Sequence, residues 1–98
     1  MTCPCSSAPA LAILQAAVAN LLAQANGLHA ALAGSPKPCT IPDYPEGSTT
    51  EQQACAALAA IDMLLNYIAC LNGPIGQRTS CVAAVCETFS GAWDACFA

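Results

Sequence analysis

The residues best able to do chemistry in this chain are its cysteines, which number eight among 98 residues. They are Cys3, Cys5, Cys39, Cys55, Cys70, Cys81, Cys86 and Cys96. This density and the even number predict that all eight form disulfides, although spacing alone leaves the connectivity open. Each bridge can contribute about 2–4 kcal/mol to a total stability of roughly 5–15 kcal/mol. We therefore expect an oxidising location, extracellular or at a cell or spore surface.

The other reactive side chains form no catalytic or metal-binding motif. His29, the only histidine, lies at the edge of a leucine face, so we expect a packed or half-exposed structural role. Nothing places a thiol beside it as a nucleophile, and Asp62 and Glu87 have no spacing that marks a carboxylate pair. Cys3-Pro4-Cys5 lacks the second ligand pair of a zinc site. We predict no enzymatic activity, no metal and no other cofactor.

Charge restricts the classes of partner. Only Lys37 and Arg78 are basic, against six acidic residues, which gives a net charge of −4. This balance argues against nucleic acid and against anionic membranes as partners. The charged fraction is only 8%, while 56% of residues are hydrophobic. Apolar surface must therefore remain after folding, and it needs a second copy or an apolar ligand to cover it.

Hydrophobic periodicity and helix-end signals predict one all-α domain, 1–98, built as a small disulfide-stapled bundle. Its three main helices are expected at about 8–33, 49–72 and 80–97. A cysteine-containing arm, 1–7, precedes them, and Ser7 can cap the first helix. A connector, 34–48, holds four prolines and is long enough for a crossover. Tyr44 within it suggests either a recognition loop or, preferably, part of a rigid crossover.

The central helix has the clearest signals. Ser48/Glu51, Thr49/Gln52 and Thr50/Gln53 are three possible capping boxes. Asn72-Gly73-Pro74 should end the helix, with Gly73 in the left-handed conformation. An aliphatic stripe is expected to pack on its neighbours, and it comprises Leu58, Ile61, Leu64, Leu65 and Ile68. Cys55 and Cys70 share another face, with Asp62 and Asn66, and offer thiols for cross-linking.

The first helix has two apolar faces. The broader face comprises Leu11, Leu14, Val18, Leu21, Leu22, Ala25, Leu28 and Leu32. A second line of small residues comprises Ala12, Ala16, Ala19, Ala23, Gly27 and Ala30, and it suits close approach of another helix. Alanines that simply face water are the alternative. The helix is long enough to span a membrane, but its amides and His29 make that role unfavourable.

The last helix is expected to be capped by Thr79 or Ser80. Its core face comprises Cys81, Val82, Val85, Cys86, Phe89, Trp93 and Cys96. Gly91 suggests a close crossing or a break.

These features favour a structural, self-assembling coat or filament subunit, stabilised by disulfides that lie either within one chain or between copies. A homo-oligomer or polymer is the expected partner, through the small-residue line of the first helix. The alternative is a small secreted carrier of a lipid or sterol, with a pocket lined by Leu, Ile and Phe. The sequence begins without a signal-peptide pattern, so we expect either a removed signal or oxidation after release.

Overall fold

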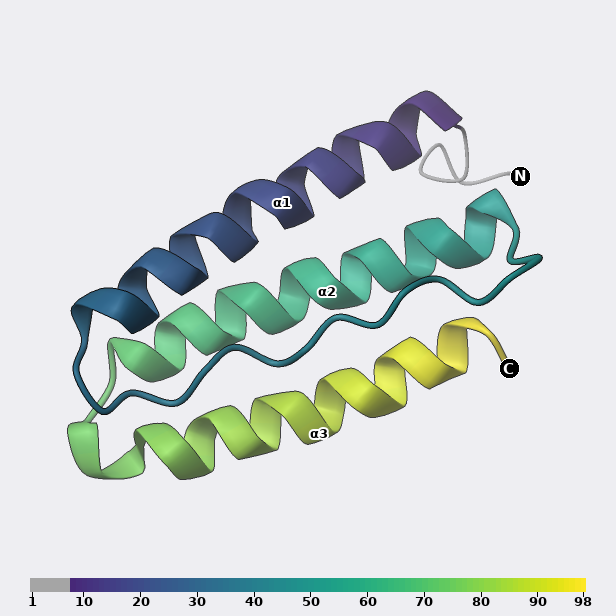
Figure 1. The fold of residues 1–98 in the computed structure, drawn as a ribbon. Helices are drawn as coiled ribbons and strands as arrows, with labels where there is room; N and C mark the ends of the chain where they lie inside the picture. The colour runs from purple at the N-terminus through teal and green to yellow at the C-terminus, as the bar shows by residue number, and fades with distance from the viewer. Residues whose placement is uncertain (1–7) are drawn as a thin grey trace.

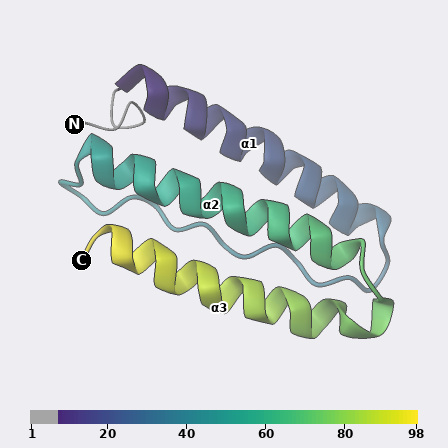
Figure 2. The same ribbon diagram turned by 180° about the vertical axis from the view of Figure 1, so that it is seen from behind.

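The computed structural model describes residues 8–98, which form three α-helices and one extended connection (Figures 1 and 2). Helix α1 spans Ala8–Ala31, α2 spans Thr50–Leu71 and α3 spans Arg78–Cys96. A short 3-10 helix, η2, covers Ile75–Gln77 directly before α3. Within the described residues there is no strand. The predicted small all-α fold is confirmed, and each predicted helix end lies within about two residues of the observed one.

The connector sets the topology. Residues 34–48, called the strap below, run back along the whole bundle between the end of α1 and the start of α2 (Figures 1 and 2). An extended chain of that length covers roughly 45–50 Å, and the longest dimension of the molecule is 44 Å. Because the strap returns the chain to its starting end, α1 and α2 are parallel. The short turn through η2 makes α2 and α3 antiparallel.

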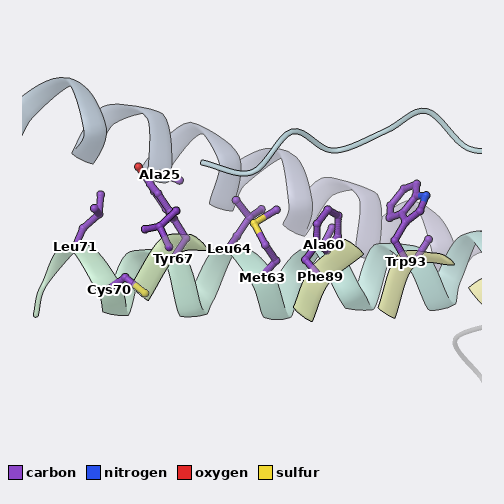
Figure 3. Packing of buried hydrophobic residues seen from close by; sticks show 11 residues of the cluster. Ala25, Ala60, Met63, Leu64, Tyr67, Cys70, Leu71, Phe89 and Trp93 are labelled. Carbon is purple, nitrogen blue, oxygen red and sulfur yellow. The ribbon is translucent and has the colours of Figure 1, made fainter. Parts of the chain in front are cut away.

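Helix α2 lies in the middle and supplies most of the core. It packs on α1 along one side and on α3 along the other, and the strap lies along the assembly (Figure 1). The largest fully buried side chains all belong to α2: Tyr67, Met63, Leu64 and Leu71. Phe89 and Trp93 of α3 and Ala25 of α1 also belong to this cluster (Figure 3). The leucine face of α1 is confirmed, since all its members except the half-buried Leu14 are buried or packed against this cluster.

The prediction that the aliphatic stripe of α2 packs on neighbouring segments is partly wrong. Leu58 is 45% exposed and Leu65 is 53% exposed. The buried side of α2 is rotated away from them and is lined largely by small residues, including Ala56, Ala57 and Ala60. Alanines let the neighbouring helices and the strap approach α2 closely, so the most hydrophobic stripe is not the most buried one.

Of the three possible capping boxes, the chain uses the middle one. The Thr49 hydroxyl accepts a bond from the Gln52 backbone at 3.0 Å, and the Gln52 side chain accepts one from the Thr49 backbone at 2.9 Å. At the other end the helix stops at Asn72 as predicted, but Gly73 is not left-handed. Asn72 stays right-handed, and its amide donates to the Ile68 carbonyl at 3.1 Å. This bond satisfies a terminal carbonyl without a left-handed residue.

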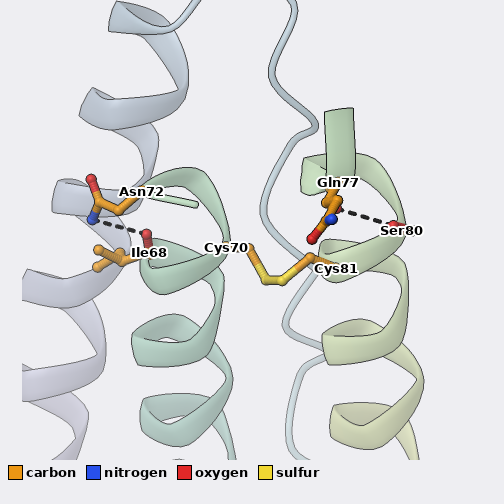
Figure 4. Close-up of a disulfide and its surroundings, with 6 residues drawn as sticks. All are labelled: Ile68, Cys70, Asn72, Gln77, Ser80 and Cys81. Atoms are coloured by element: carbon orange, nitrogen blue, oxygen red, sulfur yellow. Dashed lines mark hydrogen bonds between the residues drawn. A yellow bond between two sulfur atoms is a disulfide. The ribbon is translucent and has the colours of Figure 1, made fainter. Parts of the chain in front are cut away.

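The start of α3 also differs from the prediction. Its N-cap is Gln77, without a side-chain cap, and the Ser80 hydroxyl instead donates to the Gln77 carbonyl at 3.1 Å (Figure 4). The reason is that η2 runs directly into α3, so the helix does not begin from an extended residue. Gly91 lies exposed in unbroken α3, with open space around it, and marks neither a crossing nor a break.

Candidate assembly surface

Six cysteines fall within the described residues, and all six are paired inside the chain. Cys39–Cys86 ties the strap to α3. Cys55–Cys96 ties the start of α2 to the end of α3. Cys70–Cys81 ties the end of α2 to the start of α3 (Figure 4). The thiol face predicted on α2 therefore serves cross-linking within the molecule, and these six thiols are not available for intermolecular bridges. Cys3 and Cys5 lie outside the described residues.

Two further contacts hold the strap. The Tyr67 hydroxyl donates to the Pro36 carbonyl at 2.7 Å. Tyr44 stacks on Trp93, with ring centroids 5.8 Å apart. Burial of the Tyr67 phenol raises its pKa above the usual value of 10.0, because the charged form would lose its hydration. Tyr44 is thus an anchor of a fixed crossover, as the sequence favoured.

The small-residue line of α1 is entirely exposed: Ala12, Ala16, Ala19, Ala23, Gly27 and Ala30. At 100° per residue these positions span about 80° of the helix, and their centre lies about 160° from that of the leucine face. The line therefore points away from α2 and the strap. No other part of the described chain covers it, and we call it the outer face of α1.

Uncharged amides border the outer face on both sides. The same geometry places Gln15 and Asn26 along one edge, and Asn20 and Gln24 along the other. All four are exposed. A smooth apolar centre with a polar margin is the usual anatomy of a protein interface. The sequence marks the outer face as a stripe of small residues, but the direction of this stripe depends on which side of α1 meets α2.

Large apolar side chains are also exposed elsewhere. Leu58 and Leu65, seven residues apart, share one side of α2, while Ile13 of α1 and Ile75 of η2 are 71% and 79% exposed. Sequence reasoning missed the α2 pair because it assigned them to the core. The sequence carries no signal of their exposure, because both lie on the aliphatic stripe.

Three candidate reactive side chains lie on three different helices: His29 on α1, Asp62 on α2 and Glu87 on α3. His29 Nδ1 lies 3.1 Å from the Ser35 hydroxyl, which itself donates to the His29 carbonyl at 3.3 Å, so the pair braces the end of α1. Asp62 and Glu87 are both exposed, on α2 and α3. Among residues 8–98, no group of three His, Cys, Asp or Glu residues is placed to hold a metal ion.

Two helices are long and apolar enough to cross a membrane, by length and composition alone: Pro9–Ala31 and Thr50–Leu71. Half of the α2 window is buried inside the molecule, as expected for the central helix of a bundle, but only 11% of the α1 window is. The exposed amides around the outer face of α1 would be costly in hydrocarbon. They are compatible with a protein interface, where amides can bond across the contact.

No protein-family model, no curated protein and no solved structure matches this chain.

Proposed function

We propose that this protein is a structural subunit of an extracellular or surface coat or filament, which associates with copies of itself through the outer face of α1. The observation that carries the proposal is that this face is exposed, uncharged and directed away from the rest of the molecule. Three disulfides are consistent with an oxidising, extracellular setting.

The charge distribution supports a second copy as the occupant. A molecule of net charge −4 repels its copies. All six acidic residues, however, lie in the strap, α2 and α3, and none lies in α1. Contact between two α1 helices therefore keeps the acidic groups away from the interface. An antiparallel pair also places opposite helix dipole ends beside each other.

The size of the contact predicts how tight the association is. From Ala12 to Ala30 the outer face is about 27 Å long, since a helix rises 1.5 Å per residue. With a width on the order of 12 Å, two copies bury roughly 600–800 Å², below the 1,200 Å² typical of stable complexes. We therefore expect reversible, concentration-dependent pairing by α1 alone. Growth into a coat or filament needs a second surface, and the exposed Leu58 and Leu65 supply a candidate.

The filled interior favours assembly over internal lipid carriage. A carrier needs an enclosed apolar cavity. In the described residues the central space is occupied by Met63, Leu64, Tyr67 and Leu71, each at most 2% exposed.

A charge placed on the outer face tests the proposal. Ala19→Glu introduces a carboxylate at the centre of the contact, where pairing would strip it of water. Ala83→Glu on exposed α3 is the matched control, with the same change in size and charge. In sedimentation velocity we expect Ala19→Glu to weaken self-association at least ten-fold and Ala83→Glu to leave it nearly unchanged. Equal effects of the two substitutions would contradict the proposed contact.

A further inference from the structure

A groove between α1 and the strap has the features of a small-molecule site. Its volume is about 440 Å³, and its lining comprises Leu22, Asn26, His29, Lys37, Pro38, Cys39, Thr40 and Ile41. We propose that this groove binds a small amphiphile with a carboxylate head and an apolar chain. The inference does not rest on self-assembly, since it concerns a different side of α1.

Charge is the first argument for a carboxylate. The whole chain has two Lys or Arg residues and one His, and two of these three, Lys37 and His29, line this groove. No acidic residue lines it, although the chain has six. Within residues 8–98, no carboxylate forms an ion pair with exposed Lys37 and no hydrogen bond uses its amine. The groove thus presents an uncompensated positive charge in an otherwise acidic molecule.

The position of His29 is fixed at the wall of the groove. The Ser35 hydroxyl has one proton and donates it to the His29 carbonyl. Its oxygen can then accept a bond from Nδ1–H, which lies 3.1 Å away. Nε2 is left without a partner among the described residues. The amide of Asn26 and the hydroxyl of Thr40 add donors for carboxylate oxygens.

The apolar part of the lining suits an aliphatic chain. Leu22, Pro38 and Ile41 contribute apolar surface from both sides of the groove. The volume lies in the usual range for ligand sites, about 300–1,000 Å³. Suppose that each carbon takes about 30 Å³, the volume of one water molecule in the liquid. The groove then has room for a chain of about ten carbons and its carboxylate head.

The groove is also held in shape. The Cys39–Cys86 bridge fixes the strap beside it, and the bond from Tyr67 to the Pro36 carbonyl fixes the segment just before Lys37. A preformed wall loses little conformational entropy when a ligand binds. This groove opens at the surface, whereas the carrier expected from the sequence would enclose its ligand.

The experiment compares head groups on one chain. Decanoate and decanol are titrated into the oxidised full chain by calorimetry, with ¹⁵N chemical shifts to locate the site. Lys37→Ala removes the charge, and Arg78→Ala, at the start of α3, is the matched control because it changes the net charge equally. Lys37 is preferable to Asn26 as the test position, because Asn26 also borders the outer face of α1.

We expect decanoate to bind more tightly than decanol, with shifts at Leu22, Thr40 and Ile41. Lys37→Ala should weaken decanoate binding about five-fold, as loss of one partly screened charge pair predicts, and leave decanol binding unchanged. Arg78→Ala should change neither. Equal affinity for both compounds, equal effects of the two substitutions, or no binding by a correctly folded chain would each overturn the proposal.

Discussion

Replacing Cys39 and Cys86 together by alanine removes the bridge that ties the strap to α3. The two residues are 47 positions apart, but the other bridges shorten the loop that this one closes. With Cys55–Cys96 intact, the shortest covalent path between them is about 26 residues, through residues 39–55 and 86–96. The chain-entropy relation then gives a loss of about 3.5 kcal/mol, rather than about 4 kcal/mol for the full separation.

The assay is guanidinium unfolding of the oxidised variant, followed by far-UV circular dichroism and by Trp93 fluorescence. Fluorescence includes a report on the strap, because Tyr44 stacks on Trp93. The comparison is Cys70→Ala with Cys81→Ala, whose bridge closes a loop of 11 residues and should contribute about 2.8 kcal/mol. A loss below about 1 kcal/mol for the Cys39/Cys86 variant would refute the view that the bridge stabilises the fold by restricting the unfolded chain.

Two smaller predictions concern single hydrogen bonds. Thr49→Ala removes the capping box of α2 and should lower the free energy of unfolding by about 1 kcal/mol. Thr79→Ala is the control, because α3 has no side-chain cap, and it should lower this free energy less. Equal losses in the two variants would count against the cap. Tyr67→Phe leaves the Pro36 carbonyl without its partner and should cost about 1–2 kcal/mol at neutral pH. Because burial raises the Tyr67 pKa above 10.0, the wild-type fold favours the neutral phenol, so its stability should fall as pH rises above about 10. Tyr67→Phe should make that alkaline decline shallower, and an unchanged slope would contradict the assigned burial effect.

The sequence predicts the helices well because their ends are marked locally. Proline and glycine bound the strap, and the Thr49/Gln52 pair lies at the observed start of α2. The leucine face of α1 was likewise predictable, because its large apolar residues recur at three- and four-residue spacing along one broad side of the helix.

Other features depend on contacts between distant segments. Leu58 and Leu65 were expected in the core, but the strap and the two neighbouring helices cover the alanine-rich side of α2 instead. The pairing of Cys39 with Cys86 depends on the path of the strap, which no local pattern encodes. The groove around Lys37 was missed for the same reason, because it combines residues of α1 with residues of the strap.

The most direct test of self-association through α1 is sedimentation equilibrium of the oxidised wild-type chain from about 1 μM to about 1 mM, a range that covers weak protein contacts. We expect the apparent mass to rise above the 9.9 kDa of one chain as concentration increases. The six cysteines of the described residues should form no disulfides between chains during this rise. A constant mass of 9.9 kDa across the whole range would contradict the proposed role of the outer face.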